Sequence, residues 1–296
     1  MTSSPAAAQP SASSRAAELF PWLFVLLWST GFLGARMGLP HAEPLTFLGI
    51  RYAAVVALML LIALATRAPW PKTAGQWFHI GVSGVLVHAL YLGGVFVAIS
   101  KGLPAGVASL VVGLQPLLTA VGAGLWLGES VRKPQWLGLL LGLLGIGLVL
   151  GNKLGSVFGL TALWPALVAL LAITVGTLYQ KKFCPPMDWR TGAVAQFVPT
   201  AILTLAAAAL TETMVVRWTG EFVFALGWLI LVLSIGAISL LNWLIRNSNA
   251  VNIASLFYLV PPCTTLFAWL LFGETFSGPA LVGMAIAVIG VYLARR

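Results

Sequence analysis

The stretch "LQPLLTAVGAGLWLGES" at residues 114–130 has a partner, "LVPPCTTLFAWLLFGET", at residues 259–275. Each stretch places a proline early, continues with apolar residues, and reaches a Gly-Glu pair near its end. Pro116 and Glu129 are 13 positions apart, as are Pro261 and Glu274, and the two prolines differ by 145 positions (261 − 116). A chain of 296 residues therefore repeats one pattern at an offset close to half of its length.

The same offset of 145 relates residues along nearly the whole chain, without a gap. The matched pairs are Gly31 with Gly176, Arg36 with Lys181, Pro40 with Pro185, Gly75 with Gly220, Lys101 with Arg246, Thr119 with Thr264, Pro134 with Pro279, Gly138 with Gly283 and Gly145 with Gly290. Matches of leucine and alanine would follow from the composition alone, whereas prolines and glycines are rarer. The sequence therefore predicts an internal repeat.

The composition indicates a membrane protein. Hydrophobic residues make up 60% of the chain, charged residues only 8%, and the mean hydropathy is +1.00. Soluble domains carry about 25% charged residues, and a spanning helix needs about 20 mainly apolar ones. The net charge of +9 is spread thinly between apolar segments, without basic runs or interleaved aromatics, so nucleic-acid binding is not expected.

Ten apolar segments are long enough to be read as spans, so we expect an all-α membrane protein. They cover residues 20–38, 44–66, 75–100, 104–127, 134–151, 158–180, 190–211, 221–245, 250–272 and 279–295. Residues 1–18 are rich in Ala, Ser and Pro, and are expected to form a disordered tail. We expect one five-helix repeat over residues 19–151 and a second over residues 158–296.

The distribution of Lys and Arg predicts the orientation. With the N-terminus in the cytoplasm, the inner segments carry Arg15, Arg67, Lys72, Arg132, Lys133, Lys181, Lys182, Arg190, Arg246, Arg295 and Arg296. The outer segments carry only Arg36, Lys101, Lys153 and Arg217. Basic residues favour the cytoplasmic side, so both termini are expected there, with the chain in the inner (plasma) membrane.

Five spans per half is an odd number, so the second half must enter the membrane from the opposite side. Inverted repeats of this kind recur in secondary transporters, with the substrate site near the midplane between the halves. We therefore expect a central cavity, and alternating access through it. Because both halves belong to one chain, a monomer can suffice.

The doubled pattern resembles a known family. Each five-helix half has a proline 13 positions before the Glu of a Gly-Glu pair, followed by a Gly-rich last helix. This arrangement is similar to the EamA-type repeats of the drug/metabolite transporter superfamily. The resemblance covers nearly the whole chain after residue 18. Within the superfamily the chain looks most like the YddG branch, which implies export of aromatic and other neutral amino acids, and of the dication methyl viologen.

Other functions fit the sequence less well. The chain has no HxxxxD, GxSxG, HExxH or P-loop pattern, so an enzyme is not expected and no cofactor or metal is implied. A nucleotide-sugar or other metabolite carrier would share the architecture, but such polyanions need several basic residues at midplane, where only Arg51 comes close. A receptor or binding protein would bind its ligand without transporting it.

The acidic residues are informative because none lies in the middle of a span. They are Glu18, Glu43, Glu129, Asp188, Glu212, Glu221 and Glu274. Proton-coupled transporters usually carry an intramembrane carboxylate, and here only His88 could replace it. We therefore expect facilitated movement down a gradient, with His88 left open between a structural and a coupling role.

Pro116, Pro261 and Pro262 lie within apolar spans and are candidate hinges, although a static kink is the alternative. Glu129 follows Gly128, a candidate C-cap, and is expected to be structural, close to Arg132 and Lys133. Arg51 lies about two turns into its span, where either a functional role or snorkelling to the interface is open.

The candidate cavity residues are polar or aromatic groups in central spans. They are Trp28, Ser29, His88, Tyr91, Gln115, Trp164, Tyr179, Asn242 and Tyr258. The remaining tryptophans near span ends fit an interfacial belt, namely Trp22, Trp70, Trp77, Trp136, Trp189 and Trp218. Spans 1, 3, 4, 6, 8 and 9 are expected to line the cavity, with the fifth helix of each half packed outside on a glycine stripe.

Overall fold

The computed structural model describes residues 12–103, 108, 111–150, 160–272 and 278–294. In these residues the regular structure is helical, apart from one isolated antiparallel bridge between Ala42 and Val216. Glu274 and residues 1–11 of the expected tail lie outside the described residues. Helix α1 begins at Ala12, inside the segment 1–18 that was expected as a tail.

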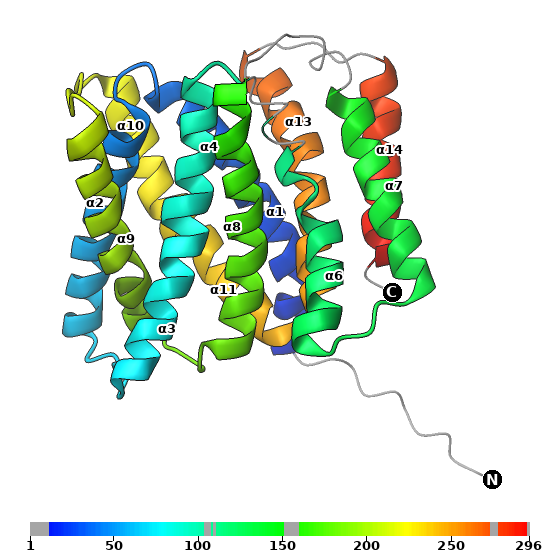
Figure 1. The fold of residues 1–296 in the computed structure, drawn as a ribbon, viewed down its shortest axis with the longest axis horizontal. Helices are drawn as coiled ribbons and strands as arrows, with labels where there is room; N and C mark the ends of the chain where they lie inside the picture. The colour runs from blue at the N-terminus through cyan, green and yellow to red at the C-terminus, as the bar shows by residue number, and fades with distance from the viewer. Residues whose placement is uncertain (1–11, 104–107, 109–110, 151–159, 273–277, 295–296) are drawn as a thin grey trace.

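Most of the helices stand side by side across one slab, as Figure 1 shows. Their bounds are α1 (Ala12–Gly38), α2 (Pro44–Ala65), α3 (Ala74–Gly84), η1 (Val85–Leu90), α4 (Tyr91–Ser100), α6 (Gln115–Leu127), α7 (Lys133–Leu150), α8 (Leu160–Phe183), α9 (Trp189–Thr211), α10 (Gly220–Trp228), η3 (Leu229–Ala237), α11 (Ile238–Asn247), α12 (Ala250–Leu256), η4 (Phe257–Leu259), α13 (Val260–Phe272) and α14 (Gly278–Ala294).

Within the part of the chain that the structure describes, seven helical segments are long and apolar enough to cross a membrane. They are Leu19–Gly38, Pro44–Ala65, Ala74–Ser100, Thr161–Phe183, Trp189–Thr211, Gly220–Asn247 and Ala250–Leu271. The other three predicted spans correspond to the shorter helices α6, α7 and α14, of 13, 18 and 17 residues. At 1.5 Å per residue, α7 and α14 reach about 26 Å, a little less than the ~30 Å of a hydrocarbon core.

Two spans contain a π-helical segment that the sequence pattern did not predict. Segment η1 joins α3 to α4, and η3 joins α10 to α11. A π-helix bonds each residue to the fifth along the chain, so it changes which side chains share a face. This change decides where His88 and Ser234 point.

Helices α7 and α14 form a pair at one end of the slab, on the right in Figure 1. A Cβ added at Gly145 would lie 2.5 Å from the backbone N of Ala287 and 2.7 Å from the carbonyl O of Gly283. Small residues let helix backbones approach this closely in lipid. Nothing lies within 4 Å of a Cβ at Gly147, so that glycine is not part of the contact.

The candidate hinge prolines lie at the starts of helical segments, whereas Pro21, Pro165 and Pro199 lie inside helices. Pro116 is in the first turn of α6, and Pro261 and Pro262 are in the first turn of α13, which follows the 3₁₀ turn η4. A proline in the first turn of a helix removes no intrahelical hydrogen bond. Each of these prolines therefore lies where a helical segment begins within its predicted span, and their role as hinges stays a prediction.

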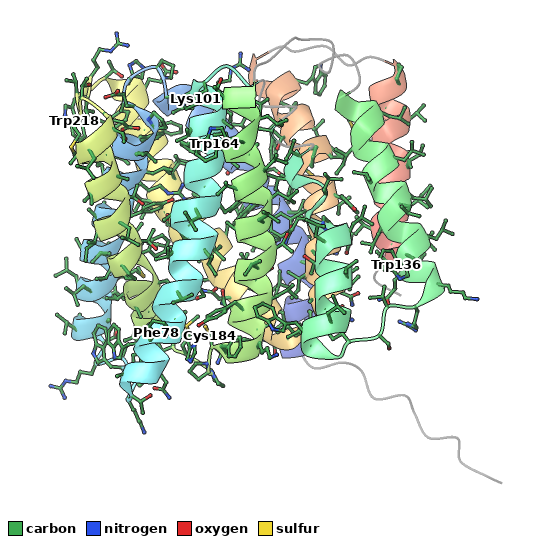
Figure 2. All side chains as sticks on the ribbon, viewed as in Figure 1. Phe78, Lys101, Trp136, Trp164, Cys184 and Trp218 are labelled. Carbon is green, nitrogen blue, oxygen red and sulfur yellow. The ribbon has the colours of Figure 1, made fainter. Side chains whose placement is uncertain are left out.

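The two edges of the slab carry aromatic side chains. In Figure 2, Trp218 and Trp164 lie towards the upper edge, and Phe78 and Trp136 towards the lower edge. Trp22, Trp77, Trp136, Trp189 and Trp218 are all exposed. The edges therefore have the character of membrane interfaces. We call the edge that contains Gly38 and Pro44 the upper face, and the edge that contains Gly128 and Phe183 the lower face.

Candidate functional site

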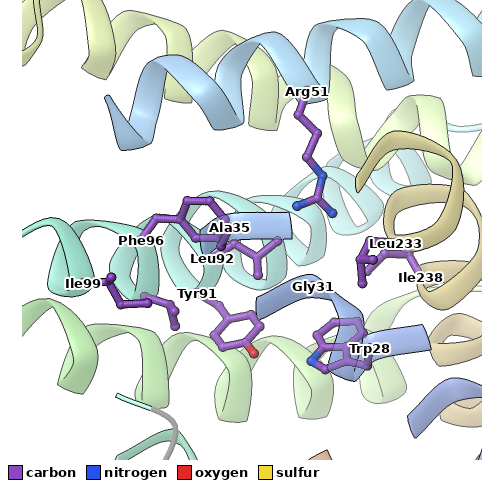
Figure 3. Close-up of a pocket in the computed structure, with 11 residues that line it drawn as sticks. Trp28, Gly31, Ala35, Arg51, Tyr91, Leu92, Phe96, Ile99, Leu233 and Ile238 are labelled. Atoms are coloured by element: carbon purple, nitrogen blue, oxygen red, sulfur yellow. The ribbon is translucent and has the colours of Figure 1, made fainter. Parts of the chain in front are cut away.

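A pocket lies between α1, α2, α4, η3 and α11 (Figure 3). Arg51 is seven residues after the start of α2 at Pro44 and Ile99 is at the end of α4, so the pocket is nearer the upper face. Its lining residues are Trp28, Gly31, Ala35, Arg51, Tyr91, Leu92, Val95, Phe96, Ile99, Leu233 and Ile238. The space open to water inside it is about 40 Å³. One water needs about 10–15 Å³ on this measure, and ligand pockets usually reach ~300–1,000 Å³, so the helices must move apart to admit an organic ligand.

One wall of the pocket is aromatic. The rings of Trp28 and Tyr91 are nearly parallel, with centroids 6.4 Å apart and 7° between their planes. Both side chains are buried, and Phe24 and Phe257 pack against the indole from behind. Neighbours on several sides hold the Trp28 ring in place, so the wall is pre-ordered for contact with a flat apolar group.

The opposite wall carries a single cation. Arg51 is 3% exposed, and its guanidinium enters the pocket from α2, facing Trp28 and Tyr91 (Figure 3). Its Nε donates a hydrogen bond to Ser234 Oγ at 2.9 Å, and its Cζ lies 5.8 Å from the centre of the Tyr52 ring. Of the two possibilities left open by the sequence, snorkelling is excluded, because the side chain is buried in the pocket wall.

His88 does not line this pocket, although it precedes Tyr91 by three residues. The i, i+3 rule that places such residues on one face holds for an α-helix, whereas His88 lies in the π-helical η1. Its ring stacks on Phe197 with centroids 4.3 Å apart, and neither ring nitrogen has a hydrogen-bond partner among the described residues.

A chain of polar side chains crosses the protein below the pocket. Gln180 Nε2 donates to Asn242 Oδ1 at 2.8 Å, Asn242 Nδ2 donates to Gln196 Oε1 at 3.3 Å, and Gln196 Nε2 donates to Ser83 Oγ at 3.2 Å. This lower polar chain joins α8, α11, α9 and α3. Its amide and hydroxyl groups could equally bond to water if the helices moved apart.

An ion pair lies beyond the lower polar chain, at the lower face. Lys181 Nζ is 2.9 Å from Glu129 Oε1 and also donates to the carbonyl O of Ser248. Glu129 Oε2 accepts from the backbone N of Ala250, which begins α12, at 3.0 Å. We call this group the lower clasp, because it ties the end of α6 to α8 and α12.

The contacts of Glu129 agree with the structural role expected for it, and they add a partner, Lys181, that was not expected. Gly128 is the C-cap of α6 in the left-handed conformation, with φ of 68°. Because the chain reverses there, Glu129 meets Lys181, which is distant in sequence, rather than Arg132 or Lys133.

The other candidate residues lie outside the main pocket. Gln115 lines a small cavity behind the lower clasp, with Thr177 and Lys181. Ser29 donates to the carbonyl O of Val25 and Val260. The Tyr179 hydroxyl bonds His79 Nδ1 at 2.6 Å. Asn242 belongs to the lower polar chain. Of the candidates, Trp28 and Tyr91 alone are among the residues that line the pocket.

Trp164 and Tyr258 are placed by their surroundings. Trp164 is 56% exposed on the outer side of α8, so it fits the interfacial belt (Figure 2). Tyr258 is fully buried, and a Cβ at Gly142 would collide with its ring, so it packs against α7. Their positions could not be predicted, because helices that are apolar all round give no signal of which face points inward.

Acidic residues of the described chain hold the ends of helices rather than the pocket. Glu212 accepts from the backbone N of Leu45 and Thr46 at the start of α2, at 2.8 and 2.7 Å. Outside the spans, hydrogen bonds from Thr213 hold the pKa of Glu43 below its ordinary value. The pKa of Asp188 is also lowered, mainly because the Arg190 guanidinium donates a hydrogen bond to its carboxylate. The described residues contain no cluster of three or more His, Cys, Asp or Glu side chains suited to a metal.

Comparison with known proteins places the chain in a family. The model of the EamA-like transporter family matches residues 16–151 and again residues 160–296. The chain belongs to the EamA-like transporter family. As a family member it is a multi-pass membrane transporter, and its relatives include inner membrane proteins.

Relatives of this EamA-like transporter share about a quarter of its residues. It is 28% identical over 279 residues to "Uncharacterized inner membrane transporter YedA" of Escherichia coli K12, covering 93% of this chain and 90% of that one. It is 26% identical over 291 residues to "Uncharacterized transporter YvbV" of Bacillus subtilis, covering 95% and 91%. A "Probable amino-acid metabolite efflux pump" of Salmonella typhimurium is 23% identical over 282 residues, with 92% of each chain covered.

The fold also occurs in a solved crystal structure. It superimposes on this EamA-like transporter with a TM-score of 0.77, at 24% identity, and covers 95% of this chain and 96% of the other. At this identity the likeness concerns the fold alone.

Proposed function

We propose that this EamA-like protein exports neutral amino acids, aromatic ones included, across the inner membrane by alternating access. The observation that carries the proposal is the pocket itself, which is buried, mostly apolar, walled by Trp28 and Tyr91, and shared between the two halves of the chain. The relatives named amino-acid metabolite efflux pumps support the same substrate class. The more specific likeness to the YddG branch stays a prediction.

We further propose that the halves are inverted five-helix repeats, giving ten spans in all. The helix bounds support this, since α6 covers residues 115–127 and α13 covers 260–272, which is an offset of 145 at both ends (260 − 115 and 272 − 127). Helices α2 and α9 begin at residues 44 and 189, with the same difference. The π-helical segments η1 and η3 overlap under this shift, and the family model matches once in each half.

The two proposed repeats suggest how access would alternate. The pocket lies nearer the upper face, and we take the lower polar chain and the lower clasp as the barrier between it and the lower face. Both α1 and α14 have their chain-terminal ends towards the lower face in Figure 1, and the excess of Lys and Arg favours a cytoplasmic location for this face. In this orientation the structure is closed towards the cytoplasm, and separation of the segments at Pro116 and Pro261 would open it. One chain, acting as a monomer in lipid, suffices.

Uptake measurements across substrate classes test the proposal. Purified protein in liposomes is offered labelled phenylalanine, leucine, glutamate and a nucleotide sugar. We expect flux of the two neutral amino acids, because the pocket is apolar and aromatic, and none of the nucleotide sugar, because Arg51 is the single basic residue among those that line it. Flux of the nucleotide sugar alone would favour a metabolite carrier, and binding of all four without flux would favour a receptor.

A further inference from the structure

We propose that Arg51 is the anchor for the substrate carboxylate, and that the pocket recognises apolar or aromatic monocarboxylates whether or not they carry an amino group. This inference rests on the proposed function, since it takes the pocket of Figure 3 as the substrate site. It narrows the substrate class, because it makes the carboxylate the required group and the amine dispensable.

Arg51 has no anionic partner among the described residues. A buried cation is costly unless it is paired. The acidic side chains whose contacts the structure describes are engaged elsewhere: Glu43 with Thr213, Glu129 with Lys181, Asp188 with Arg190, Glu212 with the start of α2, and Glu221 with His41. A bound anion would supply the missing charge.

A hydrogen bond from the second half of the chain fixes the direction of the Arg51 guanidinium. Ser234, from η3 in the other half, accepts the hydrogen bond from Nε. Among the described residues the two terminal nitrogens have no hydrogen-bond partner, and a guanidinium edge matches a carboxylate with two parallel hydrogen bonds. Arg51 belongs to the first half of the chain and is hydrogen-bonded to Ser234 in the second. A carboxylate bound to Arg51 would therefore lie where the two halves meet.

Aromatic side chains face the Arg51 guanidinium across the pocket. The parallel rings of Trp28 and Tyr91 offer an apolar surface for the body of the ligand, opposite Arg51 (Figure 3). None of the residues that line the pocket is acidic, so nothing in the lining pairs with an ammonium group. A dication such as methyl viologen would meet Arg51 without any anion to offset the repulsion, and is therefore not expected to bind.

The experiment measures binding to the purified protein without transport. Isothermal titration is carried out with L-phenylalanine, 3-phenylpropionate, phenethylamine and methyl viologen. We expect the two carboxylates to bind with affinities within about tenfold of each other, and the two amine-type cations not to bind, since a hydrogen-bonded charge contributes about 10- to 100-fold in affinity. Binding of phenethylamine as tight as that of 3-phenylpropionate would overturn the inference.

Substitutions at the anchor give a second, independent readout. Arg51→Gln should weaken the binding of both carboxylates by about 10- to 100-fold. Arg51→Lys should restore part of this affinity, because lysine keeps the positive charge but cannot donate two parallel hydrogen bonds. Arg246→Gln is the matched control, since Arg246 is exposed, bonds the carbonyl O of Met187, and is remote from the pocket lining. If the Arg51 variants fail to fold, Ser234→Ala, which frees Nε, should still weaken carboxylates while leaving the cations unbound.

The inference and the proposed function can fail separately. If 3-phenylpropionate binds in an Arg51-dependent way but no amino acid crosses the membrane, amino-acid transport is wrong and the carboxylate anchor stands. If phenylalanine is transported and Arg51→Gln leaves its affinity unchanged, transport stands and the anchor is wrong.

Discussion

The lower clasp should hold the protein closed towards the lower face, and its removal should open it. Glu129 and Lys181 are 21% and 22% exposed, and their charges are 2.9 Å apart. A partly exposed pair of this kind contributes about 1 kcal/mol, and the capping bond from Glu129 to Ala250 N adds about 1 kcal/mol. A loss of 1–2 kcal/mol corresponds to a factor of about 5–30 in an equilibrium.

The assay is the labelling rate of a reporter cysteine behind the clasp. Ala254 is 1% exposed and lines the small cavity with Gln115 and Lys181. In a background of Cys184→Ser and Cys263→Ser, Ala254→Cys should react with a maleimide only when the lower face opens. We expect Glu129→Gln or Lys181→Met to raise the rate by about 5- to 30-fold. The double variant should raise it little further, because the two residues act as one unit.

A control variant separates the clasp from a general effect of charge loss. Asp188→Asn removes the ion pair with Arg190, whose atoms lie 2.8 Å apart, but Asp188 does not line the cavity behind the clasp. The labelling rate should therefore stay unchanged in this variant. Equal rates in wild type, Glu129→Gln and Lys181→Met, or fully additive effects in the double variant, would refute the reasoning.

Three further outcomes follow from the described contacts. Gly145→Leu should lower the melting temperature, because its side chain would collide with the α14 backbone, whereas Gly147→Leu should not. Arg190 lowers the pKa of Asp188, so the ionised carboxylate stabilises the fold above pH 3.8, its ordinary pKa. This stabilisation is lost as the pH falls through the lowered pKa. In pH-dependent unfolding, Asp188→Asn should therefore remove that part of the loss of stability in acid. Replacing Pro116 and Pro261 together by Ala should slow transport in proteoliposomes, and an unchanged rate would exclude the proposed hinges.

Much of the fold could be predicted from the sequence, because membrane spans are long apolar runs with clear punctuation. The predicted span 44–66 corresponds to α2 at 44–65, and the predicted span 190–211 corresponds to α9 at 189–211. The proline and glycine matches at the offset of 145 anticipated the positions of α6 and α13. These features are local in sequence, so no knowledge of packing was needed.

The site could be predicted only in part, because it depends on which face of each helix points inward. Trp28 and Tyr91 could be predicted, because each is an aromatic side chain with one polar group and lies within a central span. Arg51 was left open between a functional role and snorkelling. Its partner Ser234 was missed, since it lies in the π-helical η3, where α-helical spacing rules do not apply. Phe96 and Leu233 line the pocket but look like every other apolar residue in their spans.

Counterflow in proteoliposomes decides whether this protein moves its ligand or only binds it. Vesicles preloaded with unlabelled phenylalanine are diluted into labelled phenylalanine, with and without an imposed pH gradient. We predict transient accumulation of label that requires the preload and does not respond to the pH gradient, since no acidic side chain lines the pocket. Absence of accumulation would contradict alternating access, and a strict dependence on the pH gradient would contradict facilitated movement.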